Sequence, residues 1–268
     1  MTNDASKVAL SGSARGLGAA TDAQYDVIQN IWGRGCLSPL DALFGAQAIM
    51  RLVPTKGFGF TGLHLGQRLL KYADDLKARV DAVERDATLT RLYARKKSSI
   101  HNMAFEFQRL PFQTSRYEAF IVMQTCVLGV PLDVLYGQGA ASLKKQGQIF
   151  CADLMARKDG CDVRLKARGT SASNEWSFQS RESHTQTLQD AGLKIEDCLD
   201  LSKALLAAIR SGFYQSLPML AELRTPGQAK RMKAVLHYLE QLETWGAIYD
   251  MVENGGLEAV AILATKVR

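Results

Sequence analysis

The sequence predicts a mainly α-helical fold, a multi-helix bundle with a helix-turn-helix-like element and a small β hairpin near 161–179. Residues 67–110 contain no glycine or proline, the two residues that most often interrupt a helix. Apolar residues recur at helical spacing over 195–217 and again over 228–253. By contrast, 161–179 alternates apolar and polar side chains on either side of a Gly-Thr-Ser-Ala-Ser-Asn linker, which is the pattern of a hairpin.

The helices are expected in the following order. Asp22 caps a short first helix, and Pro39 opens a second over 39–53, in the first turn where its missing N–H is harmless. A glycine-rich connector over 54–62 leads into the long segment, which either forms one helix or divides into two near 84–88. Residues 117–157 are again mostly helical, and Gly255-Gly256 ends the last helix.

These elements divide the chain into four parts. The Ser-, Gly- and Ala-rich start is expected to be flexible, and the alternating segment is expected to join two helical regions. The parts are a flexible N-terminus (1–21), a helical domain with the basic helix-turn-helix-like element (22–158), a β hairpin or linker (159–182) and a C-terminal helical region (183–268).

Composition narrows the class of protein. With 47% hydrophobic and 22% charged residues, the chain has the balance of a globular protein rather than a disordered one. The net charge of +6 and the pI of about 9.1 favour anionic partners mildly. No secretory signal is evident, and no apolar stretch reaches the ~20 residues that cross a bilayer. Five scattered cysteines without a CxxC pair indicate reduced thiols. We therefore expect a cytoplasmic protein without a membrane partner.

Short motifs typical of enzymes occur in the sequence, but the flanking elements that such motifs require are missing. The sequence SGSARGLG at 11–18 resembles the glycine fingerprint of short-chain dehydrogenases, and Tyr93 with Lys97 matches that family's YxxxK pair. The required second strand and acidic residue do not follow the glycines, and the pair comes too early. Cys151, Cys161 and His184 have no spacing typical of a metal site. No GxSxG motif is present. The sequence therefore predicts no enzyme, no cofactor and no metal.

A basic cluster within the long segment is the remaining candidate site. Arg91, Arg95, Lys96 and Lys97 follow the last acid, Asp86, and no further acid occurs before position 106. If a helix starts near residue 88, Arg91 and Arg95 lie one turn apart on one face, a geometry suited to phosphates and base edges. The alternative interpretation is a solvated helix surface.

A longer pattern supports the DNA-binding interpretation. The stretches ARVDAVE at 78–84, TLTR at 88–91 and LPF at 110–112, followed by Thr114, Tyr117 and Phe120, resemble the C subunit of the flagellar master transcriptional regulator in order and spacing. The resemblance covers about residues 65–125. It implies DNA binding beside a helical partner subunit, but that family's four-cysteine zinc site has no counterpart after Cys126.

The function expected from the sequence is therefore DNA binding by a non-enzymatic transcriptional regulator. Its contacts would be Arg91, Arg95, Lys96 and Lys97, and its partners would be DNA and either a protein or a second copy, bound through the helices 195–217 and 228–253. The alternative is a helical protein–protein adaptor or structural subunit of a larger cytoplasmic assembly. An NAD(P)-dependent short-chain oxidoreductase is the third possibility.

Overall fold

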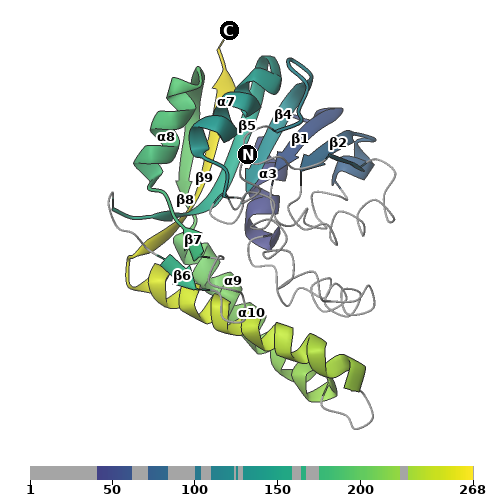
Figure 1. The fold of residues 1–268 in the computed structure, drawn as a ribbon, viewed down its shortest axis with the longest axis vertical. Helices are drawn as coiled ribbons and strands as arrows, with labels where there is room; N and C mark the ends of the chain where they lie inside the picture. Colours follow the sequence, from purple (N-terminus) through teal and green to yellow (C-terminus); the bar gives the residue numbers. More distant parts are fainter. Residues whose placement is uncertain are drawn as a thin grey trace, which may run out of the picture.

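The centre of the molecule is a β-sheet. The structure, a computed structural model, describes residues 41–61, 72–83, 100–103, 110–123, 125, 129–158, 164–166, 175–223 and 229–267. Within them, seven strands form one sheet in the order β3-β2-β1-β4-β5-β9-β8 (Figure 1). The strands are β1 (Gly57–Thr61), β2 (Arg79–Val83), β3 (Ile100–Met103), β4 (Tyr117–Met123), β5 (Leu143–Ala156), β8 (Leu193–Asp200) and β9 (Leu257–Lys266).

The direction of the strands gives the sheet two distinct edges. The first five in the sheet order are parallel, and β9 runs antiparallel to both of its neighbours, β5 and β8. We call the end where β1, β4 and β5 finish, at Thr61, Met123 and Ala156, the carboxyl edge, and the opposite end the amino edge. Because β8 is parallel in direction to β5, it also ends at the carboxyl edge.

Helices cover both faces of this sheet. On one side, which we call the α9 face, lie η1, a π-helical turn (Asp41–Gly45), α3 (Ala46–Arg51), α9 (Ser202–Leu223) and α10 (Ala229–Glu253). On the other, the α7 face, α7 (Leu132–Ser142) and α8 (Arg181–Asp190) lie side by side (Figure 1). The strands between them bury both faces, so β4 reads as a nearly continuous apolar run rather than as an alternation.

Turn residues fix where several helices begin and end. Pro131 precedes α7, where its fixed φ suits a helix start. Ser180 caps α8, because its Oγ accepts a hydrogen bond of 3.1 Å from the N–H of Ser183. Gly255 adopts a φ of 75° just beyond α10, and the N–H of Gly256 donates to the carbonyl of Met251 at 2.8 Å. The prediction that the two glycines end this helix is confirmed.

The predicted fold class is wrong, because the chain forms an α/β sandwich rather than a mainly α bundle with a helix-turn-helix-like element. Residues 67–110, expected to be helical, contain β2 and β3, and β2 occupies the place of the first helix of that element. The segment 117–157 contains β4 and β5 on either side of α7. Short buried strands and buried helices share the same apolar composition, so periodicity alone does not separate them.

Other expected elements are present. The predicted hairpin corresponds to β6 (Arg164–Lys166) and β7 (Glu175–Ser177), which pair antiparallel. The helix expected over 228–253 is α10, whereas the apolar spacing over 195–217 spans the end of β8 and most of α9. None of the helices that the structure describes is long and apolar enough to cross a membrane.

Candidate functional site

The connections of β1 and β4 leave the sheet on opposite faces. After β1 the chain reaches a helical turn at 72–75, whose buried Ala73 joins the core of the α9 face. After β4 it enters α7 on the α7 face. In open parallel sheets this reversal leaves a crevice between the carboxyl ends of the two strands, and ligands bind there. β1 and β4 are neighbours in the sheet, so the crevice is expected between Thr61 and Met123.

Thr61, at the carboxyl end of β1, has a hydroxyl that lacks a partner. Its side chain is fully buried between Val83 of β2 and Val122 of β4, and among the described residues its Oγ1 is the buried side-chain oxygen without a hydrogen-bond partner. Buried hydroxyls are nearly always hydrogen-bonded, so an unpaired one indicates a function or a missing ligand. Gly62 follows directly in the sequence, and glycine allows a ligand to approach the backbone closely.

A buried carboxylate fixes the other side of the crevice. Asp153 lies on β5 with no exposed surface, and its Oδ2 accepts hydrogen bonds from both the N–H (2.6 Å) and the hydroxyl of Thr125. Its Oδ1 accepts from the N–H of Leu154 at 2.8 Å. Thr125 lies two residues beyond the end of β4, so this carboxylate holds the start of the segment that leads to α7.

Beneath the crevice, the aromatic ring of Phe120 packs against β1 at Gly59. A Cβ placed on Gly59 would lie 2.4 Å from the Phe120 ring, which is closer than real Cβ atoms approach other atoms. Gly59 is therefore required for the ring to pack here, and Phe112 meets the same ring edge-on with centroids 4.8 Å apart. The glycine-rich stretch that suggested a connector is instead strand β1, in which Gly59 allows an aromatic ring to fill the space beneath the crevice.

Cys151 and His184, which were weighed together with Cys161 as metal ligands in the sequence analysis, do contact each other in the structure. Sγ of Cys151 lies 3.8 Å from Nδ1 of His184, and the Tyr136 hydroxyl lies 2.8 Å from that sulfur and 2.6 Å from the same nitrogen. Burial raises the pKa of the Cys151 thiol and lowers the pKa of His184 to about 3. A neutral thiol and a neutral imidazole, both without access to solvent, make a structural network that links β5, α7 and α8.

Cys161 lies outside the described residues. Among those described, no group of three or more His, Cys, Asp or Glu side chains could hold a metal ion.

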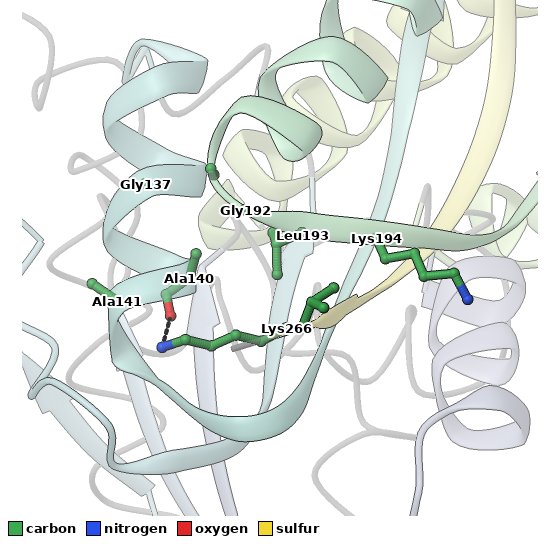
Figure 2. A pocket seen from close by; sticks show the side chains of 9 residues that line it. Gly137, Ala140, Ala141, Gly192, Leu193, Lys194 and Lys266 are labelled. Atoms are coloured by element: carbon green, nitrogen blue, oxygen red, sulfur yellow. Dashed lines mark hydrogen bonds between the residues drawn. The ribbon is translucent and has the colours of Figure 1, made fainter.

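A pocket of about 590 Å³ lies at the amino edge, far from the crevice. Figure 2 shows it between α7, the turn at Gly192 and the end of β9. Its lining consists mostly of small residues, and the Lys266 ammonium already donates 2.8 Å hydrogen bonds to the carbonyls of Ala140 and Leu143. This pocket therefore offers few polar groups that could bind or activate a ligand. We place the functional site at the carboxyl edge instead.

Two insertions rise from the carboxyl edge. α9 follows the end of β8 and α10 returns to the start of β9, so the two helices form a hairpin that extends beyond this edge of the sheet (Figure 1). The β6–β7 hairpin follows β5 and lies near the base of the same helices (Figure 1). The crevice therefore opens on the side of the molecule that carries these extra elements.

The residues proposed from the sequence do not enter this geometry. Arg91, Arg95, Lys96 and Lys97 lie outside the described residues, as do the glycine motif at 11–18 and the turn near 85–92. Sequence reasoning missed Thr61, Thr125 and Asp153. One signal was available, because Asp153 is the only charge in the apolar run 149–156. Association through 195–217 and 228–253 stays a prediction.

Comparison with known proteins identifies the fold. No protein-family model and no curated protein matches the sequence. Solved structures do match, at low identity. A protein from Galdieria sulphuraria, provisionally named a sarcosine dimethylglycine methyltransferase, is 13% identical with a TM-score of 0.65, and the match covers 91% of this chain and 98% of that one.

Two further structures match at a TM-score of 0.61. Geranyl diphosphate C-methyltransferase from Streptomyces coelicolor A3(2), solved with Mg²⁺, geranyl diphosphate and S-adenosyl-L-homocysteine, is 16% identical over 86% of this chain and 80% of that one. The [4+2]-cyclase SpnF is 17% identical over 84% and 80%. At such identities the likeness establishes the fold, a doubly wound sheet that these proteins share.

These findings correct the functional expectation. A DNA-binding, non-enzymatic regulator and a helical adaptor both depended on an all-helical fold, and the chain instead has the fold of the enzymes named above. The expectation that the chain is not an enzyme is therefore wrong, as are the helix-turn-helix and transcription assignments. The resemblance to a flagellar regulator subunit rested on short stretches, of which 78–84 lies largely in β2 and 110–120 leads into β4.

Proposed function

We propose that this chain is an S-adenosylmethionine-dependent methyltransferase. The observation that carries the proposal is the crevice between β1 and β4, in a fold shared with structures solved with S-adenosylmethionine or S-adenosylhomocysteine. When bound, S-adenosylmethionine supplies a methyl group from its sulfonium centre to a nucleophilic atom of the acceptor.

Residues at the crevice fit such a cofactor. Thr61 offers a buried hydroxyl without a partner among the described residues, and Gly62 after it leaves room for a ligand near the backbone. Glu84 follows directly on β2 in the sequence, the position at which nucleotide-binding sheets carry the acid that accepts hydrogen bonds from ribose hydroxyls. We expect Thr61 and Glu84 to hold the nucleoside part, with the segment at Thr125 beside it.

The acceptor is expected on the side of the α9–α10 and β6–β7 hairpins. Both rise from the carboxyl edge, and elements in that position shield a reacting pair from water (Figure 1). The similar structures differ in the acceptors their names give, geranyl diphosphate in one and phosphomonomethylethanolamine in another. The fold therefore leaves the acceptor to be identified by assay.

Binding of S-adenosylhomocysteine to the full chain tests the proposal. Isothermal titration calorimetry should show one site, and Glu84→Gln should raise the dissociation constant about tenfold, because it weakens a charge-assisted hydrogen bond. Glu182→Gln is the matched control, since Glu182 is an exposed acid on α8, a helix that packs against α7, β8 and β9. Binding of NADH in place of S-adenosylhomocysteine would favour the oxidoreductase and contradict the proposal.

Methyl transfer is measured separately, because one of the similar structures is a [4+2]-cyclase. The chain is incubated with methyl-tritiated S-adenosylmethionine and a panel of amine, phenol, carboxylate and prenyl diphosphate acceptors. We expect label in one acceptor class, and loss of that label in Glu84→Gln. Tight cofactor binding without transfer to any acceptor in the panel would contradict the methyltransferase activity and leave only the binding site supported.

A further inference from the structure

We propose that the amino edge of the sheet, on its α9 face, binds the surface of an anionic lipid bilayer. Three exposed aliphatic and three exposed basic residues form this surface, which we call the amino-edge patch: Met50, Val53, Val267, Lys56, Lys145 and Lys194. It lies at the end of the sheet opposite the crevice, which stays open to the aqueous phase when the patch contacts a bilayer. The proposal does not depend on the proposed function and can fail while that function stands.

The aliphatic residues of the patch are unusually exposed. In the part of the chain that the structure describes, the exposed fraction is 68% for Met50, 63% for Val53 and 56% for Val267. The two other exposed large apolar side chains, Tyr214 and Leu239, lie on the α9–α10 hairpin. Single exposed apolar side chains are common on protein surfaces, whereas a group of them at one edge indicates an interaction surface.

Hydrogen bonding and strand register bring these side chains to one part of the amino edge. The N–H of Val53 donates a hydrogen bond of 3.0 Å to Oε1 of Gln148, near the start of β5. Gln148 pairs with Thr265 of β9, and Val267 follows two residues later, where strand alternation directs it to the same face. Met50 lies in the last turn of α3, just before Val53. The end of α3 therefore lies near the end of β9.

The first basic residue of the patch lies on the same face. Lys194 pairs in register with Thr265, and Figure 2 shows its side chain extending away from α7. Its ammonium contacts the carboxylate of Glu196 at 3.2 Å, in a pair whose side chains are both well exposed. Such a surface ion pair contributes little stability, so Lys194 can exchange this partner for an anionic headgroup.

The other two lysines extend the positive charge across the starts of β1 and β5. The N–H of Lys56 donates to Glu118 at 3.3 Å, and the ammonium of Lys144 donates to the same carboxylate at 3.0 Å, so the two strand starts lie together. Lys56 and Lys145 are exposed, and neither forms an ion pair with the residues that the structure describes. Their charges are available to an anionic surface.

This composition favours a lipid surface over a protein. Protein interfaces are enriched in aromatic residues, Met and Arg and depleted in Lys, whereas the patch combines Met50 with two valines and three lysines. A second copy is disfavoured, because two identical patches carry the same charge. Aliphatic side chains that enter the headgroup region beside lysines are typical of peripheral membrane contacts. Such a contact needs no membrane-spanning helix, which was the case considered from the sequence.

Vesicle co-sedimentation of the full chain tests the proposal. Phosphatidylcholine vesicles are compared with vesicles that also contain about 30% phosphatidylserine. The wild type should sediment with the anionic vesicles, and its partition coefficient should fall several-fold when the salt concentration is raised. Absence of binding to the anionic vesicles would overturn the proposal.

Two variants separate the apolar from the charged part of the contact. Met50→Ser, Val53→Ser and Val267→Ser together keep the net charge and should lower the partition coefficient at least about tenfold, because the inserted apolar surface is lost. Lys56→Gln with Lys145→Gln should lower it about tenfold on anionic vesicles and leave the weaker binding to neutral vesicles unchanged. All five side chains are exposed, so the thermal midpoints should stay near that of the wild type. Wild-type binding by the aliphatic variant would show attraction by net charge alone and overturn the proposal.

Tyr214→Ser with Lys203→Gln is the matched control, since it removes one exposed apolar and one exposed basic side chain from α9. This variant should bind anionic vesicles as the wild type does. A loss equal to that of the aliphatic variant would place the contact elsewhere and contradict the patch. Sedimentation velocity without vesicles examines the remaining occupant. A dimer that the aliphatic variant abolishes would show that the patch binds a second copy, and would overturn the proposal.

Discussion

The two faces of the sheet bury different chemistry. On the α9 face, the buried strand residues are apolar, and Phe58, Phe60 and Phe150 fill much of the space. On the α7 face, the described strands carry four buried polar side chains, which are Thr61, Asp81, Asp153 and Glu258. The strands thus bury apolar side chains alone on one face, whereas on the other they also bury groups that need hydrogen-bond partners.

The partners of these four groups show where the site lies. Asp81 accepts from the Tyr117 hydroxyl at 2.7 Å, Asp153 accepts from Thr125, and Glu258 binds the Arg181 guanidinium through both oxygens. Among the described residues, only the Thr61 hydroxyl has no such partner, and Thr61 lies at the crevice. The unpaired polar group, rather than the pocket at the amino edge, therefore identifies the ligand site in this molecule.

The largest expected effect concerns the buried histidine of the α7 face. The pKa of His184 is lowered by burial to about 3, from an ordinary 6.5. Below pH 6.5 the unfolded chain binds a proton that the folded chain cannot, so this contribution to stability is complete above pH 6.5 and is lost as pH falls toward 3. The loss should reach about 3 kcal/mol by pH 4.

Urea unfolding of wild type and His184→Gln at pH 7, 6, 5 and 4 measures this loss. From pH 7 to pH 4 the wild type should lose about 3 kcal/mol of unfolding free energy more than His184→Gln does. Carboxylate titrations are common to both proteins, so they cancel in this comparison. A difference that stays constant with pH would mean that the imidazole titrates alike in both states, and would remove the distinction between the two faces.

A second comparison uses two glycines of one strand. Gly59→Ala places a Cβ 2.4 Å from the Phe120 ring on the α7 face and should cost about 2 kcal/mol through overpacking. Gly57→Ala meets nothing within 4 Å and should be neutral or slightly stabilising. Chemical denaturation of both variants checks this. Equal stabilities would show that the aromatic ring beneath the crevice moves freely.

A third comparison sets an ion pair of each face against the other. Arg181→Met leaves the carboxylate of Glu258, whose side chain is 6% exposed, without its cation and should cost about 1.5 kcal/mol. Arg51→Met on the α9 face frees an Asp197 side chain that is 38% exposed and should cost well under about 1 kcal/mol. Thermal unfolding ranks the two. A larger loss in Arg51→Met would contradict the description of the α7 face as the polar one.

The sequence allowed prediction of elements whose signal is local. α10 has a long amphipathic pattern and a Gly-Gly end, and the β6–β7 hairpin alternates around a polar linker. The strands β1, β4 and β5 lack such signals. β1 resembles a loop because it contains Gly57 and Gly59, and the reason for Gly59 is the ring of Phe120, which is distant in sequence. Both faces of β4 are buried, so its pattern does not alternate.

The candidate site could not be predicted from local sequence patterns either, because its residues are distant from one another in the sequence. Thr61, Thr125 and Asp153 lie on three segments that only the parallel sheet brings to one edge. No spacing along the chain links them, whereas the basic cluster at 91–97 is contiguous and attracted the functional interpretation. Asp153 could have been suspected, since a single acid within an apolar strand-like run needs a partner in the core.

One measurement tests the central claim that the crevice at Thr61 binds S-adenosylmethionine. Thr61→Val replaces the unpartnered hydroxyl with a methyl group of similar volume, so the ligand-free chain should gain up to about 1 kcal/mol of stability. Titration of S-adenosylhomocysteine should nevertheless show a dissociation constant about tenfold above that of the wild type. Equal affinities in a more stable variant would show that the hydroxyl is not part of the site, and no binding by either protein would contradict the account.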